Sequence, residues 1–282
     1  MFNILPMEAN YKEGAIMREQ LLETAVAAAR AGARLLRERW SAPRTISRKE
    51  RYDFVTDADL ASQRAVLAVI EERHPDHAIL AEEERGDPAT AARTPGVLWV
   101  VDPLDGTTNF IHGFPMAAVS VAAVAGGRPL AGAIIDVVHG EEFKAARGLG
   151  AFVDDRPMRV ADIEDRSQCL LLTGFPFRDR GRLDPYLELF KELFGQSSGV
   201  RRAGSAALDL AYVAAGRAQG FWEMGLKPWD VAAGIVLVEE AGGVVSDFAG
   251  GGEALWRGDV VAAAPGVHGW MQQACERYFP LG

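Results

Sequence analysis

Apolar positions along the chain follow helical spacing in some segments and form short uninterrupted runs in others. Residues 17–40 are rich in Ala, Leu, Arg and Glu, with apolar positions at helical spacing, and are predicted to form a helix. Thr56 and Asp59 have the spacing of a helix cap, so a second helix is expected at residues 60–73. His74-Pro75 ends this helix, because a residue before proline avoids the helical conformation.

Short apolar runs rich in β-branched residues predict the strands of the first half. Residues 78–81 and 97–101 are runs of this kind, and each leads directly into acidic residues. After residue 110 the pattern changes to strands separated by glycine-containing turns, which indicates an antiparallel sheet. These further strands are expected at residues 117–125, 129–138 and 142–146.

The second half alternates between strands and helices. Strands are expected at residues 169–174, 220–223, 244–246 and 260–264, and helices at residues 185–194, 206–215, 231–241 and 267–278. Strands clustered early and alternating elements later predict stacked layers of helices and sheets. Because no long linker divides the chain, residues 17–282 are expected to form one compact domain. Its pseudo-halves would be residues 17–155 and 156–282, behind an N-terminal extension of residues 1–16.

Charge and cysteine content narrow the classes of function. The formal net charge is −9, from 39 acidic and 30 basic residues, whereas a protein that holds nucleic acid by electrostatics alone is usually basic. An acidic protein can still bind a phosphate where a divalent cation reverses the local field. Cys169 and Cys275 are far apart, which fits a reducing cytoplasm. No apolar run is long enough to cross a membrane, so no membrane partner is expected.

The most informative segment for chemistry is Asp102-Pro103-Leu104-Asp105-Gly106-Thr107-Thr108-Asn109-Phe110. By composition alone it is a polar turn after a buried strand. A rigid turn at the end of a strand can also direct both aspartates at one hard cation, with a backbone carbonyl as a further ligand. The amides of residues 106–108 can then face a phosphate, as amides at a helix start do.

Three other acidic positions have a structural and a functional interpretation. The run Glu82-Glu83-Glu84 is most simply a solvated surface, but if its strand shares a sheet with residues 97–101, Glu82 comes beside Asp102. Carboxylates crowded in this way raise one another's pKa unless a cation binds. Asp230 is most simply the N-cap of a helix that begins at Val231, although its other oxygen stays available to a metal. Asp59 is most simply part of a capped helix start.

Other catalytic arrangements are not found in the sequence. There is no Gly-x-Ser-x-Gly nucleophile elbow and no Walker A loop. The five histidines do not have His-x₃-His spacing, so a zinc site has little support. Gly148-Leu149-Gly150 is too short for a dinucleotide fingerprint and is better interpreted as a hairpin turn.

Taken in order, the acidic segments resemble the inositol monophosphatase family. That family has a Glu-Glu pair after a strand, then Asp-Pro-Leu/Ile-Asp-Gly-Thr-Thr-Asn-Phe, then Trp-Asp before a helix, and Ala-Gly-Gly. This chain has Glu82-Glu83, the complete run of residues 102–110, Trp229-Asp230 and Ala241-Gly242-Gly243. The resemblance covers nearly everything from about Met17 onward. It implies a layered α/β/α/β/α sandwich, an α+β fold that often forms a homodimer in the cytoplasm.

The resemblance also implies a metal site. Oxygen ligands from three segments would hold two Mg²⁺ ions: Glu82, Asp102, the Leu104 carbonyl, Asp105 and Asp230. Asp102 would bridge the two ions. Glu82 and Leu104 would complete the first site, and Asp105 and Asp230 the second.

Roles toward water and substrate follow from the same resemblance. Thr107, with Asp59 behind it, would orient the attacking water, and the Gly106 and Thr107 amides would bind the phosphate. A further set would contact the polyol hydroxyls: Arg202, Gly204, Ser205, Ala206 and Glu223.

The function implied is Mg²⁺-dependent hydrolysis of a phosphomonoester, with myo-inositol 1-phosphate as the first candidate, by a metal-activated water. Lithium inhibits many members of the family. Histidinol phosphate and fructose 1,6-bisphosphate remain alternative substrates on the same fold. A regulatory protein that binds transcription machinery or RNA is an alternative of another class. The intact set of acids argues against a purely non-catalytic role.

Overall fold

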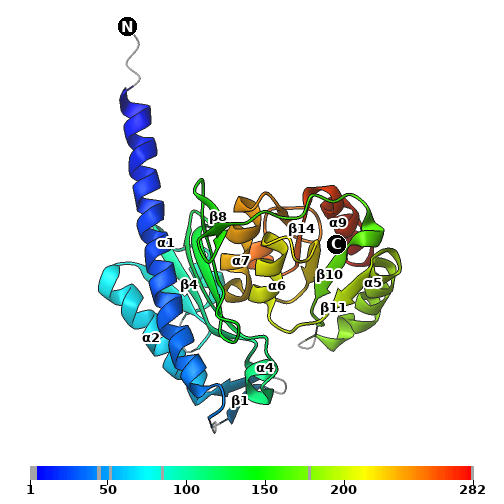
Figure 1. Cartoon of the computed structure of the whole chain (residues 1–282), viewed down its shortest axis with the longest axis horizontal. Coiled ribbons are helices and arrows are strands. Elements are labelled where there is room, and N and C mark those ends of the chain that lie inside the picture. The colour runs from blue at the N-terminus through cyan, green and yellow to red at the C-terminus, as the bar shows by residue number, and fades with distance from the viewer. Residues whose placement is uncertain (1–4, 43–45, 51–52, 84–85, 177–178, 281–282) are drawn as a thin grey trace.

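Two large β-sheets and three layers of helices alternate through the protein, beside the small two-stranded sheet β1-β2 (Figure 1). The computed structural model describes residues 5–42, 46–50, 53–83, 86–176 and 179–280. The order of the layers is helices, a seven-stranded sheet, helices, a five-stranded sheet and helices. The layered α/β/α/β/α sandwich predicted from the sequence is therefore confirmed.

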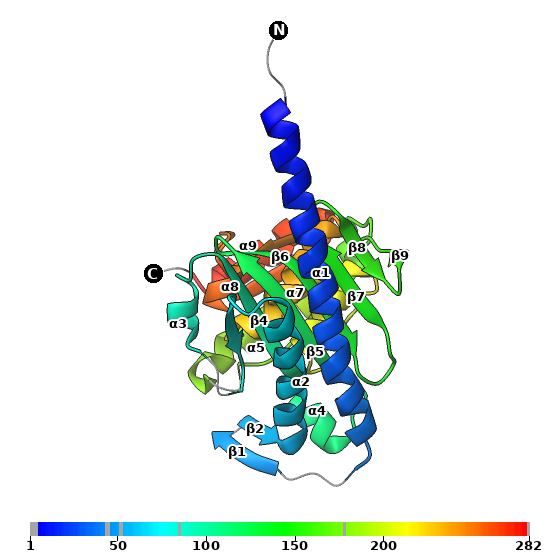
Figure 2. The same ribbon diagram turned by 90° about the vertical axis from the view of Figure 1, so that its left-hand side faces the viewer.

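The first helix layer consists of α1 (Leu5–Arg39) and α2 (Asp57–Arg73), which lie side by side over the seven-stranded sheet (Figure 2). The helix expected to start at residue 17 thus begins at Leu5. The start of α2 is capped as predicted, because the Thr56 hydroxyl accepts from the amides of Ala58 and Asp59, and the Asp59 carboxylate accepts from the Thr56 amide.

The seven-stranded sheet has the strand order β3-β4-β5-β6-β7-β8-β9. β3 and β4 are parallel, and each later neighbouring pair is antiparallel, as the glycine-containing turns predict. The bounds are β3 (Ala78–Ala81), β4 (Val97–Asp105), β5 (Ala118–Ala125), β6 (Arg128–Asp136), β7 (Glu142–Ala146), β8 (Gly150–Val153) and β9 (Arg156–Pro157). β4 continues four residues beyond the predicted end at residue 101, into the acidic segment.

The middle layer consists of α6 (Ala206–Ala214) and α7 (Pro228–Glu240), which lie between the two sheets. Residues 231–238 of α7 are all buried, which is typical of a helix with apolar residues on all sides. The prediction that α7 begins at Val231 with Asp230 as its N-cap was wrong. Pro228 is already the first helical residue, because proline lacks an amide that would need a partner there, and Asp230 is the third.

The second sheet has the order β11-β10-β12-β14-β13, with α5 and α9 on its outer face. The bounds are β10 (Leu170–Thr173), β11 (Gly199–Arg201), β12 (Gly220–Glu223), β13 (Val244–Ser246), β14 (Val260–Ala263), α5 (Leu183–Gln196) and α9 (Pro265–Tyr278). The remaining short elements are β1 (Ile46–Glu50), β2 (Asp53–Thr56), α3 (Pro88–Ala91), α4 (Thr107–His112), α8 (Ala254–Arg257) and the 3₁₀ turns Arg166–Gln168 and Arg180–Arg182.

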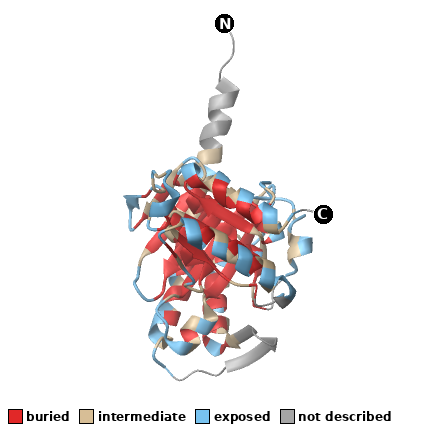
Figure 3. Cartoon of the chain, turned by 90° about the vertical axis from the view of Figure 1, so that its right-hand side faces the viewer, coloured by how far each residue is buried: buried red, intermediate tan, exposed pale blue. Residues whose placement is uncertain are grey.

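Alternate residues of each strand pack on opposite faces of the sheet and so belong to different parts of the core. In β4, Leu98 and Val100 face the middle helix layer, whereas Trp99 and Val101 face α1 and α2. Buried residues fill the interior between the layers, and exposed residues lie on the outer faces (Figure 3). None of the helices in the described ranges has an apolar stretch of the length that crossing a membrane requires.

A cluster of rings joins α1, the end of α2 and β4. The His74 and His77 rings stack with their centroids 4.6 Å apart, and the Trp99 indole N–H donates to His77 Nδ1 at 3.2 Å. His74 Nε2 also shares a hydrogen bond with the Thr24 hydroxyl at 3.1 Å. Burial lowers the pKa of His74 below its ordinary value, and the neighbouring His77 and Arg73 lower it further.

The lowered pKa of His74 predicts acid sensitivity of the fold. The unfolded chain takes up a proton near pH 6.5, the ordinary value, and the folded chain does so only at lower pH, so stability falls as the pH drops through that range. His74→Gln is therefore expected to lose less melting temperature than wild type between about pH 7.5 and about pH 5.5. His112→Gln, at an exposed position, serves as the control and should keep the wild-type pH dependence. Equal pH dependence for His74→Gln and wild type would contradict the assignment.

Candidate active site

The ends of the parallel strands β3 and β4 bring two acidic segments together. Ala81 pairs with Val101, and the Glu82 amide donates to the Val101 carbonyl at 3.1 Å. Glu82 therefore follows in register beside Asp102, the juxtaposition expected if the two strands share a sheet. Glu83 is buried, and Glu84, the third acid of the run, lies outside the described residues.

Three aspartates from two separate segments converge at this sheet end. Asp102 and Asp105 belong to β4, and Asp230 lies in the first turn of α7. Each offers a carboxylate oxygen, and these oxygens all lie within 4.8 Å of one another. Asp102 is 1% exposed and Asp105 is 9% exposed, so solvent does little to screen their charges.

The raised pKa values of Asp102 and Asp105 show that this crowding disfavours their charged forms. Burial raises the pKa of Asp102 well above its usual range, and the charges of Glu82, Asp105 and Asp230 raise it further. Burial also raises the pKa of Asp105 to about 6, although the Ser205 hydroxyl (2.5 Å) and the Ala207 amide (2.8 Å) donate to its Oδ2. A divalent cation would relieve this repulsion, and oxygen ligands of this kind suit Mg²⁺.

An irregularity in β4 separates Asp102 from Asp105 and includes Leu104, whose backbone amide and carbonyl both contact site residues. The register with β5 shifts between Asp102 and Asp105, and the Leu104 amide donates to Asp102 Oδ1 at 3.0 Å. The Leu104 carbonyl lies 3.1 Å from the Thr107 hydroxyl. Bulges of this kind re-aim side chains and carbonyls at functional sites.

Asp59 contacts both the start of α2 and Thr107. Its Oδ2 completes the cap of α2 by accepting from the Thr56 amide (2.9 Å) and hydroxyl (2.5 Å), and its Oδ1 lies 3.1 Å from the Thr107 hydroxyl. Burial raises the pKa of Asp59, although these hydrogen bonds lower it. The same carboxylate therefore fixes the helix and places Thr107.

The chain leaves the cluster through Gly106 into α4. Gly106 has φ +87°, and a Cβ there would lie 2.7 Å from the Met116 carbonyl oxygen. The Asn109 side-chain amide donates to the carbonyls of Met116 (2.8 Å) and Ala203 (2.9 Å), which ties α4 to the segment before α6. No role for Asn109 was predicted from the sequence, because a motif does not reveal which backbone groups a side chain reaches.

The residues expected to contact a polyol lie on the second half of the chain. Ser205 caps α6, accepts from the Leu208 amide at 3.4 Å, and donates to Asp105 as described. Gly204 and Ala206 flank it, and a Cβ on Gly204 would collide with the Arg202 guanidinium, which therefore lies over this glycine. These residues adjoin the aspartate cluster through Ser205.

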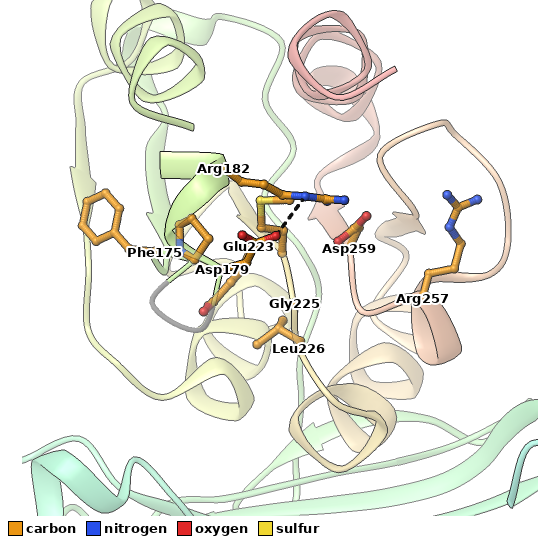
Figure 4. A pocket seen from close by; sticks show the side chains of 10 residues that line it. Phe175, Asp179, Arg182, Glu223, Gly225, Leu226, Arg257 and Asp259 are labelled. Carbon is orange, nitrogen blue, oxygen red and sulfur yellow. Dashed lines mark ion pairs between the residues drawn. The ribbon is translucent and has the colours of Figure 1, made fainter. Parts of the chain in front are cut away.

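Glu223 ends β12 and lines a pocket of about 360 Å³ (Figure 4). Its carboxylate lies against Gly174, where any Cβ would collide with it. The pocket has apolar and charged walls, which include Phe175, Pro176, Arg182, Leu226 and Asp259. An ion pair at 3.3 Å joins Arg182 Nε to Asp179 Oδ2 at the pocket.

Asp209 is a buried acid that sequence reasoning did not single out. It lies on α6 and is 1% exposed, and within the described residues its Oδ1 makes no hydrogen bond. Burial raises its pKa well above the usual range, and the charges of Glu223 and Asp105 add to that effect. An acid at the fourth position of a helix resembles an ordinary first-turn charge in sequence, so no pattern distinguished it.

A layered sandwich with carboxylates converging at a strand end and at a helix start is the architecture of a metal-dependent phosphatase. The chain belongs to the inositol monophosphatase family, whose family model matches residues 17–278. The protein "Nus factor SuhB" of Pseudomonas aeruginosa is 49% identical over 220 residues, which are 77% of this chain and 81% of that protein.

Solved structures show the same fold. The extragenic suppressor protein suhB from Bartonella henselae superposes with a TM-score of 0.83 at 35% identity, covering 93% of this chain and 99% of that one. The inositol monophosphatase from Anabaena (Nostoc) superposes with a TM-score of 0.80 at 38% identity, covering 92% and 96%. The resemblance inferred from the acidic motifs is thereby confirmed at the level of the family.

Substitution of Gly106 tests whether the contact with the Met116 carbonyl constrains the turn. Gly106→Ala is expected to destabilise the protein by more than the cost of a left-handed alanine, about 1–2 kcal/mol, because its Cβ also meets a backbone oxygen. Gly113→Ala is the matched control at the other end of α4, with φ +68° and no atom within 4 Å of the added Cβ. Urea unfolding of both variants measures the difference. Equal destabilisation would show that the contact with Met116 does not constrain the turn.

Proposed function

We propose that this protein hydrolyses a phosphomonoester with the help of Mg²⁺, and that its substrate is a polyol phosphate, in the first instance myo-inositol 1-phosphate. The observation that carries this proposal is the convergence of Asp102, Asp105 and Asp230 within 4.8 Å. Membership of the inositol monophosphatase family and the 38% identity to the Anabaena enzyme support the choice of substrate.

Glu82, Asp102, the Leu104 carbonyl, Asp105 and Asp230 would hold Mg²⁺. Bound there, Mg²⁺ supplies positive charge toward the phosphate and the leaving oxygen and makes water more acidic. The protein's own contribution is to keep acids close together that otherwise repel one another, so that little reorganisation is needed when the cation and the substrate bind.

Thr107 is proposed to orient the attacking water. Its hydroxyl can donate its single proton to Asp59 or to the Leu104 carbonyl, both at 3.1 Å. An oxygen lone pair of Thr107 then remains to accept a hydrogen bond from water. The amides of Gly106 and Thr107 follow directly and would bind the phosphate oxygens.

Glu223, Arg202 and the Gly204-Ser205-Ala206 segment are proposed to contact the leaving group. Glu223 is buried and lines the pocket in Figure 4, which has room beyond a single hydroxyl contact. Histidinol phosphate and fructose 1,6-bisphosphate therefore belong in any substrate panel beside inositol phosphate.

Asp102→Asn tests the metal-dependent chemistry. Phosphate release from the three esters should need Mg²⁺ and fall on addition of lithium in wild type, and Asp102→Asn should lower the maximal rate by about 10²-fold or more. Its fold should survive, because a neutral amide removes repulsion from Glu82 and Asp105. A near-normal rate at saturating Mg²⁺ would rule out the proposed role of Asp102.

A second function is favoured by the names of relatives. The Pseudomonas aeruginosa protein at 49% identity is called a Nus factor, so we also propose binding to a protein of the transcription machinery.

We propose that the protein works in the cytoplasm, and its two buried cysteines, which form no disulfide, fit that location. We also propose that it works as a homodimer, as is common in the family.

The two functions separate in one experiment. Affinity-tagged wild type and Asp102→Asn are each used to capture partners from cells, and captured transcription proteins are quantified against the bait. If the partner role exists, both variants should hold the same transcription protein in near-stoichiometric amount, although only wild type turns over substrate. Capture of no transcription protein by either variant would exclude the second function.

A further inference from the structure

The helix α2 presents three buried polar side chains on one face toward the aspartate cluster. Asp59, Ser62 and Gln63 follow the i, i+3, i+4 spacing of a single helix face and are 1%, 0% and 7% exposed. Each side chain contacts a different segment of the candidate site. Buried polar groups are costly unless hydrogen bonded, so such a row on one helix needs an explanation.

Gln63 binds the backbone just beyond the end of β3. The Glu83 amide donates to Gln63 Oε1 at 3.0 Å, and Gln63 Nε2 donates to the Glu83 carbonyl. The ladder with β4 has its last pair at Ala81 and Val101, so the Gln63 carboxamide takes the place that a neighbouring strand would otherwise occupy. Glu82 is thereby fixed from both sides, through its own amide on Val101 and through Glu83 on Gln63.

Ser62 makes the corresponding contact with the other acidic segment. Its hydroxyl donates to the Pro103 carbonyl at 2.7 Å, at the irregularity of β4 that lies between Asp102 and Asp105. The hydroxyl itself is confined by α1, because a Cβ on Gly32 would lie only 2.6 Å from Ser62 Oγ. The contact of α1 with α2 therefore leaves the Ser62 side chain little freedom to turn away.

The contacts of Gln63 and Ser62 hold two backbone segments whose carboxylates, those of Glu82 and Asp102, repel each other. After burial, the charge of Glu82 does most to raise the pKa of Asp102. Without restraint, a strand end can relax such repulsion by moving its carboxylate toward solvent, and a cation would then have to draw it back. Holding the backbone in place removes that cost from cation binding.

We propose that Gln63 and Ser62 are positioning residues that set the affinity of the site for divalent cations, by holding the backbone on which Glu82 and Asp102 are mounted. This inference rests on the proposed function, since it takes Glu82 and Asp102 as metal ligands. It extends that function to α2, a helix that supplies none of the proposed metal ligands.

Gln63→Met removes both hydrogen bonds and keeps the length of the side chain. The matched control is Gln219→Met, because Gln219 also clamps a strand end: its Oε1 accepts from the Leu170 amide at 2.7 Å, and its Nε2 donates to the Gly216 carbonyl at 3.4 Å. That clamp lies in the second sheet, at the start of β10. Both variants are expected to lower the melting temperature.

Only Gln63→Met should change cation binding. Mn²⁺ serves as the probe, and its binding to the full chain without substrate is followed by the loss of the free-ion electron paramagnetic resonance signal. Gln63→Met should raise the dissociation constant about tenfold or more, as losses of groups that orient metal ligands do. Gln219→Met should stay within about twofold of wild type. In phosphate-release assays, Gln63→Met should need more Mg²⁺ for half-maximal rate, with its maximal rate largely kept.

Ser62→Ala provides a second, smaller variant that leaves the volume of the core almost unchanged. It should weaken Mn²⁺ binding in the same direction by about two- to fivefold, as expected for the loss of one neutral hydrogen bond. Wild-type Mn²⁺ affinity in both Gln63→Met and Ser62→Ala would overturn the inference and leave these residues a purely structural role. If wild type binds no Mn²⁺, or if Asp102→Asn binds it as wild type does, the proposed function itself fails and the inference with it.

Discussion

Repulsion between buried carboxylates is the constraint on which the rest of the site depends. Asp102 and Asp105 lie at the end of a buried strand, where burial alone makes their charged forms unfavourable, and Glu82 and Asp230 bring further negative charge. A chain that places acids so close needs rigid surroundings and an incoming positive charge. The surroundings come from elements on every side of the cluster.

The layered architecture supplies those elements from both halves of the chain. The seven-stranded sheet provides Asp102 and Asp105, and the middle helix layer provides Asp230 and the Ser205 and Ala207 donors to Asp105. α2 reaches the same point from the opposite face of the sheet. The candidate site thus lies where three successive layers meet, and each layer fixes a different part of it.

Much of the fold could be predicted from the sequence because its signals are local. The runs at residues 78–81 and 220–223 are strands with the predicted bounds, since short apolar segments between polar turns have few other solutions. The start of α7 was misplaced, because a proline that ends a strand-like segment and a proline that opens a helix look alike until the surrounding backbone is known.

The acids of the site could be predicted from the sequence and its family resemblance, whereas their supports could not. Gln63 contacts a backbone segment distant in sequence, and Asp209 is buried near the charges of Glu223 and Asp105, but nothing in their immediate neighbours distinguishes either residue. Asn109 belongs to the motif of residues 102–110, but the motif does not reveal its contact with the Ala203 carbonyl. The pocket lined by Glu223 also has walls from Phe175, Pro176, Arg257 and Asp259, whose approach depends on the order of strands in the second sheet. Such features need tertiary structure.

The burial of α7 on all sides has a consequence for the molecule as a whole. One end of this helix carries Asp230 and its body belongs to the hydrophobic core between the two sheets. A cation held at that end would stabilise the folded over the unfolded state by mass action, and the gain would be shared by both sheets because neither can lose α7 alone. The concentration of free divalent ions would then affect the lifetime of the folded protein as well as its catalytic rate.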